Sequence, residues 1–528
     1  MRPRRLLSAS LALALACCAN GDAGSPTDAG MPGPDARDAD ALAGERSMPC
    51  ALNAPELQIS PAHAEAVPAG TPLTYTLTIT NMDAPACAPS AFSSSVSPDV
   101  TGLPFQIEPA FITTAAVGGG QSTSVDVVVR SHAEEEPGDY RLRFFVRSPQ
   151  GTGARTCTAE ADYRVREPEG CHVVSARELL IRDTSVVDDP QRTASARSGA
   201  WSFGELMRRV APAPDQAPRM LEDVLRSFTQ DQTINGFQVP LRPNMATGLL
   251  SYWERTPKGE LDLTRAPMRL LAIVHRLDLG EGRFVFGVLT SDQASLLFTL
   301  ILEYTLPGSP RDWARSVHAL QALPFPSEDY NRALQDLTDR FSAHGAAPER
   351  PNGSALLRLR TNENALGRDG RWEMREFQLS AETGSFVPAT LAQTPDRSWN
   401  GKPQLAAFIN DNQPSILRET HGVPALLSGQ AFQAGNVINE LGHWDASGVR
   451  DQEARRSFSR NTCDGCHGGE TATSFFQVFP RAAGEQSALS GFLRGSVVRD
   501  PVTGEQHTYN ELRRRQQLLA AIVCANED

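Results

Sequence analysis

Cys463, Cys466 and His467 form a C-x-x-C-H motif within residues 461–470, NTCDGCHGGE. The chain has only 9 Cys and 10 His in 528 residues, so this spacing is rare by chance. The three residues are compatible with covalent haem attachment, with a bare metal ion, or with a disulfide beside an ordinary histidine. The choice depends on where the chain resides and on the elements around the motif.

The N-terminal sequence MRPRRLLSASLALALACCAN has the features of a secretory signal. Three Arg precede an apolar run over residues 6–16, which is too short to span a bilayer. The stretch LALACC resembles the lipobox of bacterial lipoproteins, in which a diacylated cysteine becomes the new N-terminus, and Cys17 and Cys18 fit that role about equally. We therefore expect residues 1–17 to be a signal peptide with a lipobox, which implies a membrane anchor; a plain cleaved signal is the alternative.

Residues 18–49 contain no aromatic residue and only one β-branched residue. Such a segment buries too little apolar surface to offset its ordering entropy, so we expect a disordered tether. No later apolar run reaches the length of a membrane span, and the formal net charge of −12 argues against a nucleic-acid partner. We expect an exported protein of the cell envelope, either an outer-membrane lipoprotein or a periplasmic protein.

Export makes the other cysteines candidates for disulfides. The sequence leaves their pairing open. Cys50 and Cys87 are one candidate pair, and Cys524 is available to Cys171 or to Cys157.

Alternating apolar residues run through residues 50–168. TPLTYTLTITN alternates Leu73, Tyr75 and Leu77, and STSVDVVVR and GDYRLRFFVR continue the pattern. This period of two predicts strands that form an all-β sandwich. VPAGTPLTYTLTITN and PGDYRLRFFVR resemble the immunoglobulin-like modules of secreted bacterial enzymes and surface proteins, which implies a spacer or binding role without catalytic residues.

Residues 169–445 mix strand and helix patterns. RLLAIV, RFVFGVL and LLFTLILEYTL predict strands, while SPRDWARSVHALQAL and SEDYNRALQDLTDRF predict helices with Ser309 and Ser327 as N-caps. RWEMREFQLSAETGSFVPATL predicts a hairpin that turns near residues 382–384. We expect an α+β domain of unknown function, in which residues 350–367, dense in Asn and Arg, form an ordered loop.

The main polar cluster of this domain is VHRLDLGEGR, with His275, Arg276, Asp278, Glu281 and Arg283 between two apolar strands. Convergent charges at the end of a sheet can line a ligand site. The alternative, which the pattern favours, is a solvated hairpin loop with surface ion pairs.

The motif lies in the last segment, residues 446–528. A short helical pattern over residues 453–460 leads into C-x-x-C-H, and YNELRRRQQLLAAIVC predicts a closing helix. This order resembles a small, mainly-α c-type cytochrome domain. The resemblance implies one covalent haem c per chain, with thioethers to Cys463 and Cys466 and His467 as the proximal iron ligand.

The sixth iron ligand is a second question that the resemblance raises. Such domains often supply a Met before the closing helix, but no Met follows Met374. His507, in GEQHTYN, occupies about that position, so we expect His467 and His507 to be the two axial ligands. His443 and an open sixth site are the alternatives.

The competing chemistries use the same residues. A zinc site requires more ligands than this motif offers, and a thioredoxin-like dithiol requires a βαβ context. The whole chain also resembles uncharacterised envelope lipoproteins. We expect a multidomain, lipid-anchored haem protein with an electron-transfer role, not an enzyme by itself, whose redox partner the sequence does not identify. A structural or surface-binding lipoprotein without haem, and a haem-linked oxidoreductase that uses the middle domain, are the alternatives.

Overall fold

The computed structural model describes residues 50–98, 105–132, 135, 137–148, 155–167, 169–367, 370–438 and 442–524. The chain divides near residue 167 into two compact units. The predicted signal, lipobox and tether lie outside the described residues, and so do Cys17 and Cys18. Within the described ranges, no helix combines the length and the apolar character needed to cross a membrane.

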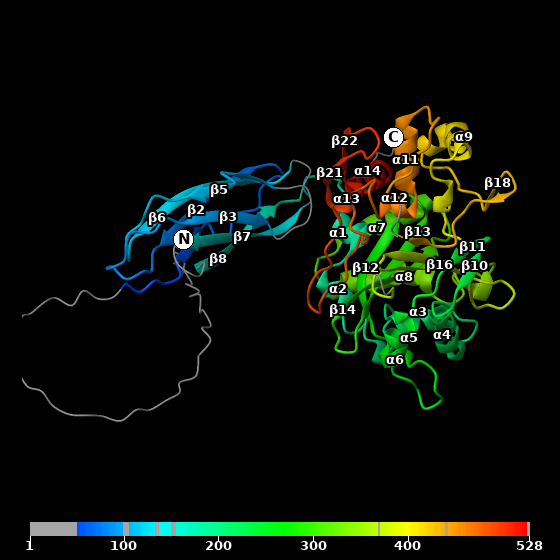
Figure 1. Ribbon diagram of the computed structural model, residues 1–528. Helices are drawn as coiled ribbons and strands as arrows, with labels where there is room; N and C mark the ends of the chain where they lie inside the picture. The colour runs from blue at the N-terminus through cyan, green and yellow to red at the C-terminus, as the bar shows by residue number, and fades with distance from the viewer. Residues whose placement is uncertain are drawn as a thin grey trace, which may run out of the picture. The chain divides into compact units, whose positions relative to one another are not determined.

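The first unit, drawn in blue and cyan in Figure 1, consists of two four-stranded antiparallel sheets. In spatial order the sheets contain β1 (Glu56–Ser60), β2 (Pro72–Thr80), β6 (Ser122–Arg130) and β4 (Gln106–Glu108), and β5 (Phe111–Thr113), β3 (Ser93–Pro98), β7 (Gly138–Ser148) and β8 (Arg155–Val165).

A shared apolar core joins the two sheets of this unit. Tyr75 and Leu77 on β2 pack into the same cluster as Leu142 and Phe144 on β7, and all four are fully buried or nearly so. Because side chains alternate along a strand, one face of each sheet supplies this core. The predicted β-sandwich is confirmed.

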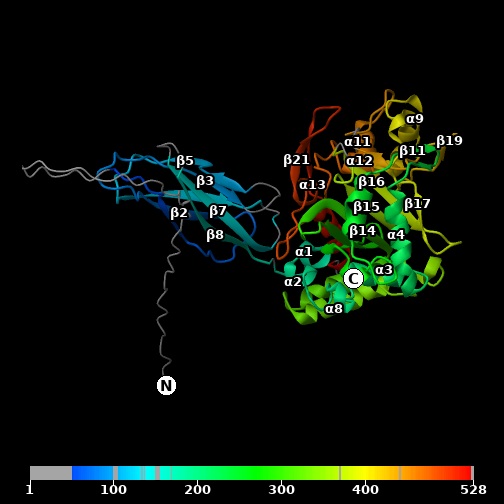
Figure 2. The ribbon, with the colours of Figure 1, turned by 60° about the horizontal axis from the view of Figure 1, so that its bottom comes forward.

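The second unit contains one eight-stranded antiparallel sheet and three small hairpins; the neighbouring strands β14 to β17 can be followed in Figure 2. The sheet is ordered β17 (Phe386–Ala389), β16 (Glu373–Leu379), β15 (Leu356–Glu363), β14 (Ser295–Thr305), β13 (Glu281–Leu289), β12 (Met268–Arg276) and β9 (Leu180–Ile181), and β20 (Val437–Ile438) also pairs with β16. The hairpins are β10 (Gln232–Ile234) with β11 (Phe237–Val239), β18 (Leu426–Leu427) with β19 (Gln430–Ala431), and β21 (Ser496–Arg499) with β22 (Gln506–Tyr509).

Helices cover both faces of this sheet. Figure 1 shows α3 to α6 on one side and α11 to α13 on the other. The helices are α1 (Ser175–Glu178), α2 (Thr184–Val187), α3 (Phe203–Val210), α4 (Ala217–Ser227), α5 (Asn244–Thr247), α6 (Leu249–Tyr252), α7 (Pro310–His318), α8 (Glu328–Ser342), α9 (Pro403–Asp411), α10 (Gln413–Leu417), α11 (Gln452–Asn461), α12 (Cys463–Cys466), α13 (Gly491–Arg494) and α14 (Glu511–Val523).

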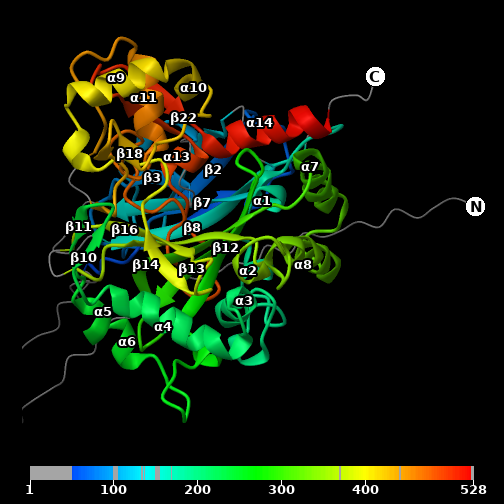
Figure 3. The same ribbon diagram turned by 90° about the vertical axis from the view of Figure 1, so that its right-hand side faces the viewer.

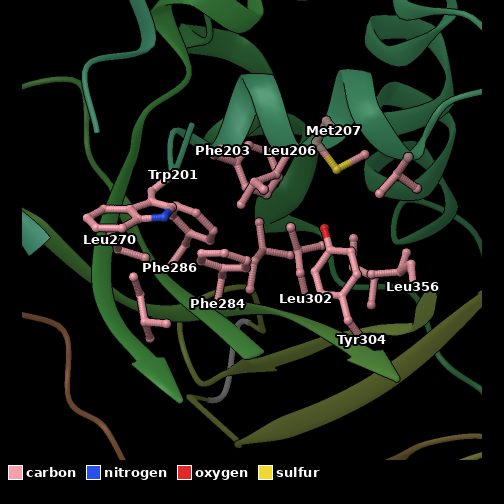
Figure 4. Close-up of a cluster of buried hydrophobic side chains, with 14 of the residues drawn as sticks. Trp201, Phe203, Leu206, Met207, Leu270, Phe284, Phe286, Leu302, Tyr304 and Leu356 are labelled. Carbon is pink, nitrogen blue, oxygen red and sulfur yellow. The ribbon is translucent and has the colours of Figure 1, made fainter. Parts of the chain in front are cut away.

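The largest core lies between α3 and the central strands. In Figure 4, side chains of α3 point toward Phe284 and Phe286 of β13 and toward Leu302 of β14. Phe203 of α3 packs edge-on to Phe286, with ring centroids 5.3 Å apart. The centre of this face of the sheet is therefore apolar and closed.

Local signals of the α+β region agree with the structure. The three predicted apolar strands correspond to β12, β13 and β14, and the predicted hairpin is β16 with β17. The hydroxyls of Ser309 and Ser327 accept hydrogen bonds from backbone N–H groups at the starts of α7 and α8. These predictions are confirmed, and the α+β architecture of the second unit is shown.

The predicted cytochrome c-like C-terminal domain is wrong. The segment after residue 445 belongs to the same compact unit as the sheet and contains the hairpin β21–β22 as well as helices. Leu489 and Phe492 bury their side chains against Leu271 and Val285 of the sheet. A disulfide joins Cys171 to Cys524. The segment is not a separate mainly-α domain because its apolar side chains complete the core of the sheet.

A carboxylate is buried where β15 ends. Glu363 is inaccessible to solvent, and it accepts a 2.7 Å hydrogen bond from Arg242 and bonds of 2.9 and 2.7 Å from the backbone N–H groups of Ala365 and Leu366. Burial outweighs these contacts and raises the pKa of Glu363 to about 7.

Glu363 makes the stability of the fold depend on pH. Its pKa is about 7 in the folded protein, above the ordinary 4.5. Between these two pH values the folded protein keeps a proton on Glu363 that the unfolded protein releases. Stability from this group is complete below pH 4.5 and declines as pH rises to 7, by up to about 3 kcal/mol. In denaturant titrations at several pH values, the free energy of unfolding of Glu363→Gln should depend less on pH than that of the wild type. As a control, replacing the exposed Glu254 with Gln should leave the pH dependence of the free energy of unfolding as in the wild type. The same pH dependence in wild type and Glu363→Gln would contradict the raised pKa of Glu363.

Candidate functional site

The C-x-x-C-H motif starts at a sharp turn between α11 and α12. The Thr462 hydroxyl accepts a 3.1 Å hydrogen bond from the N–H of Gly465 and donates one of 2.6 Å to the carbonyl of Ser459. A side chain on Gly465 would collide with that carbonyl, so this position requires glycine. The Asp464 carboxylate, also within the motif, accepts a 2.8 Å bond from the indole of Trp444. Both intervening residues of the motif therefore have structural roles.

The thiols of Cys463 and Cys466 lie one helical turn apart and carry no disulfide. Cys463 is 8% exposed and belongs to a small buried cluster with Trp372, whereas Cys466 packs against the cluster that contains Leu271 and Val285. The amide of Gln477 donates to the Cys466 sulfur at 3.4 Å. Burial raises the pKa of both thiols, that of Cys466 to about 11. Both sulfurs are therefore uncharged at neutral pH.

His467 is held in one tautomer. Its Nδ1 lies 2.5 Å from the carbonyl oxygen of Phe475, which can only accept, so Nδ1 carries the proton. Nε2 then presents its lone pair, and it has no hydrogen-bond partner among the described residues. Burial lowers the pKa of His467 to about 4, so the imidazole is neutral. This is the state in which imidazole binds a metal ion.

Three further residues orient His467. Asn362 Nδ2 donates to the same Phe475 carbonyl at 3.1 Å, and Trp372 Nε1 donates to Asn362 Oδ1 at 2.5 Å. The Trp372 ring stacks on His467, with centroids 5.7 Å apart and planes 20° apart. Phe475 has a φ of 66°, which is uncommon for a residue with a bulky side chain. The strained backbone at Phe475 aims its carbonyl at the imidazole, and such strain is often found at functional sites.

An ionic cluster occupies the sheet face beneath the motif. The carboxylate oxygens of Glu303 lie 3.3, 3.2 and 3.5 Å from the guanidinium groups of Arg283, Arg358 and Arg360. Arg360 also lies 3.0 Å from Glu376. Besides burial, the charges of Arg360 and Arg283 lower the pKa of His467, so the cluster and the imidazole are electrostatically coupled.

The charged face of the central strands is partly open to solvent. Phe284, Leu300 and Leu302, on the helix-covered face, are fully buried. On the other face, three arginine side chains are partly exposed: Arg283 by 18%, Arg358 by 14% and Arg360 by 15%. These arginine side chains are therefore only partly shielded from solvent.

A buried ion triad holds the motif against its surroundings. Arg455 of α11 is inaccessible to solvent and lies 2.8 Å from Glu470, three residues after His467, and 2.6 Å from Asp500, which follows β21. Two carboxylates balance its charge, and a buried guanidinium without such partners would cost several kcal/mol. Arg455 thereby joins three segments of the C-terminal region.

Neither predicted sixth ligand, His507 or His443, is joined to His467 by a hydrogen bond or ion pair among the described residues. His507 lies on β22 with Nε2 3.7 Å from the Asp500 carboxylate, and the described contacts do not join it to His467. The described residues form no hydrogen bond or ion pair with His443. The sixth-ligand assignment stays a prediction.

The VHRLDLGEGR cluster is the hairpin turn between β12 and β13, with a buried start at His275 and an exposed tip at Leu279. His275 is fully buried and donates from Nδ1 to the Glu178 carbonyl at 2.7 Å; burial lowers its pKa to about 4. The Asp278 side chain lies between Arg276 at 2.9 Å and Arg514 of α14 at 3.0 Å, and these ion pairs are at the surface, as the sequence pattern favoured.

Sequence reasoning missed Trp372, Asn362 and Glu303. The expected loop over residues 350–367 is wrong, since residues 356–363 form β15 and turn Arg358, Arg360 and Asn362 toward the motif. The alternation of Leu and Arg in LLRLR was the signal that could have identified this strand.

A surface hollow elsewhere carries no titratable group. It has a volume of about 510 Å³ and is lined by Ser227, Gln230, Gln232, Thr233, Ile234, Asn235 and Pro388. We assign it no chemistry.

No protein-family model matches the chain, and no curated protein matches it. Among solved structures, part of the chain is similar to the VesB protease of Vibrio cholerae, with 17% identity and a TM-score of 0.14, over 21% of this chain and 32% of that one. The chain thus spans about a third of that protein's length. A TM-score this low supports no inference. The cytochrome and immunoglobulin-like resemblances therefore have no family support.

Removing the buried Arg455 should destabilise the second unit. We expect Arg455→Ala to lower the free energy of unfolding by roughly 3–5 kcal/mol, because Glu470 and Asp500 would remain buried without their partner. Urea denaturation measures this change. Arg450→Ala, on the exposed approach to the same helix, is the matched control and should cost less than about 0.5 kcal/mol. Equal effects of the two substitutions would show that the triad has no special role.

Proposed function

We propose that this protein is an exported haem carrier, in which Cys463 and Cys466 hold one haem covalently and His467 is its axial ligand. The observation that carries the proposal is the state of His467. It is a neutral imidazole, its Nδ1 proton is bound by the Phe475 carbonyl, and its Nε2 is left without a partner among the described residues. An outer hydrogen bond of this kind is the usual way in which proteins orient a metal-binding histidine.

The thiols support haem over the rival chemistries. A redox dithiol and a zinc site both require thiolates, but burial raises the pKa of Cys463 and Cys466. Thioethers are uncharged, so a buried, uncharged pair of sulfurs suits them. The donor set therefore fits a covalently attached haem, although the fold around it differs from the cytochrome domain that we had expected.

The ionic cluster supports a cofactor that has carboxylates. Haem carries two propionate groups, and the partly exposed guanidinium groups of Arg283, Arg358 and Arg360, already paired with Glu303, lie beside the motif. Trp372 and Phe475 supply aromatic surface next to them. Haem bound here would supply one-electron redox chemistry, while these residues exclude water and balance charge.

Two disulfides support export. Cys50 is bonded to Cys87 and Cys171 to Cys524, and such bonds persist mainly in oxidising compartments. With the predicted lipid anchor at Cys17 or Cys18, the β-sandwich would be a spacer between the membrane and the second unit. The proposed role is electron transfer at the cell envelope.

Covalent attachment can be tested with the full chain. Expression with export and haem-maturation machinery should give a red protein whose haem remains bound after denaturation, with one haem per chain in a pyridine haemochrome assay. A Cys463→Ala, Cys466→Ala variant should lose all covalent haem, because both thioethers are removed. Cys157→Ala, which removes a thiol in the β-sandwich, should retain it. A colourless wild-type protein, made beside a positive control, would favour a structural or surface-binding lipoprotein.

The predicted sixth ligand has its own test. If His507 completes the iron coordination, His507→Ala should convert a low-spin absorption spectrum to a high-spin one, because a strong-field imidazole is lost. His443→Ala is the matched comparison, since His443 is the rival ligand. An unchanged spectrum for His507→Ala would exclude His507.

A further inference from the structure

A second group of metal-binding side chains lies at the chain end. The Cys171 and Cys524 sulfurs and a ring nitrogen of His318 all lie within 4.8 Å of one another. The three residues come from the segment before α1, the end of α14 and the last residue of α7. Figure 3 shows α14, α7 and α1 close together. None of these residues takes part in the proposed haem site.

His318 is oriented as a metal ligand would be. Its Nδ1 lies 2.8 Å from Oε2 of Glu178, and the other carboxylate oxygen accepts a 2.6 Å bond from the N–H of Val174. Glu178 is fully buried, so this carboxylate is fixed. In the neutral ring Nδ1 carries the proton, and the lone pair of Nε2 is directed at the Cys171 sulfur, 3.7 Å away. A carboxylate, a histidine and a metal ion arranged in this order are common in zinc proteins.

The spacing of these atoms suits tetrahedral zinc. With Zn–S near 2.3 Å and Zn–N near 2.0–2.1 Å, the sulfur-to-nitrogen edge of a tetrahedron is about 3.6 Å and the sulfur-to-sulfur edge about 3.8 Å. The Cys171–His318 distance of 3.7 Å already has this length. The two sulfurs, bonded to each other in the disulfide, must move apart. Cys171 is exposed and Cys524 partly exposed, so neither sulfur is enclosed in the core.

The neighbouring His172 is not a fourth ligand. Its Nδ1 contacts the Gly170 carbonyl at 2.8 Å, and its Nε2 contacts the amide of Gln321 at 2.7 Å. Both ring nitrogens are therefore satisfied. Among the described residues the site has three protein ligands, which leaves a fourth position for water, as in reactive rather than purely structural zinc sites.

We propose that, when the Cys171–Cys524 disulfide is reduced, the two sulfurs and His318 bind a zinc ion. The disulfide and the metal site then exclude each other, since each uses the same sulfurs. Reduction by an external protein dithiol breaks the S–S bond, transfers two electrons and two protons to Cys171 and Cys524, and oxidises the dithiol to its own disulfide. Zinc binding then releases the two thiol protons. Either state keeps α14 attached to the start of the second unit.

This proposal does not depend on haem. It is tested in the full chain carrying Cys463→Ala and Cys466→Ala, which removes the other thiols of the second unit. The protein is reduced, freed of reductant without oxygen, and titrated with Co²⁺ as a spectroscopic probe and then with Zn²⁺. The oxidised protein is titrated in parallel.

We expect the reduced protein to bind one Co²⁺ with a thiolate charge-transfer band and tetrahedral ligand-field bands, and Zn²⁺ to displace it. The oxidised protein should show neither band. Cys171→Ser should abolish the bands, and His318→Ala should weaken binding at least tenfold. Replacing the Glu178 carboxylate with a neutral amide in Glu178→Gln should weaken it about 10- to 100-fold.

His172→Ala is the matched control and should bind as the parent does, with circular dichroism reporting the fold of each variant. Three results would overturn the proposal: no binding by the reduced protein, equal binding by the oxidised protein, or unchanged binding in both Cys171→Ser and His318→Ala. If Glu178→Gln does not fold, His318→Ala still tests the proposal, because the His318 side chain is partly exposed.

Discussion

The ion pairing of Glu303 is the constraint on which the second unit depends. This carboxylate lies at the centre of an eight-stranded sheet with 1% of its surface exposed, and three arginines on the flanking strands balance its charge. A buried carboxylate without such partners would cost several kcal/mol. Because side chains alternate along each strand, the residues between these charges point to the opposite face, where Phe284, Leu300 and Leu302 are fully buried. That face is the one covered by α3 and its neighbours.

The two faces of the sheet determine how the rest of the chain packs. The apolar sides of helices close one face, and the C-terminal segment covers part of the other through polar anchors as well as apolar contacts. Arg481, 1% exposed, lies 2.6 Å from Asp188 near the start of the unit, and Arg455 joins Glu470 to Asp500. A segment tied at so many points to strands and loops far away in the sequence cannot form an independent domain. The C-x-x-C-H motif is therefore part of a larger α+β unit.

The two cysteine pairs of this unit differ in chemistry because their surroundings differ. Cys463 and Cys466 lie against the charged face of the sheet, where burial raises the pKa of their thiols and disfavours thiolates. Cys171 and Cys524 lie near the surface beside His318, where a thiolate would be hydrated and close to a metal-binding nitrogen. The first environment suits uncharged sulfur, as in a thioether. The second suits sulfur that is exchanged between a disulfide and a metal ion.

The sequence by itself determined the local structure. The strands β2, β6, β7, β12, β13 and β14, the N-caps Ser309 and Ser327 and the motif spacing could all be read from residues a few positions apart, because periodicity and capping depend on near neighbours. Only the tertiary structure decided that Asn362, Trp372 and Phe475 orient His467, that Cys524 pairs with Cys171 rather than Cys157, and that the last segment completes the sheet. These contacts join residues up to 353 positions apart, and their selection depends on which burial and charge pairings the whole chain can satisfy at once.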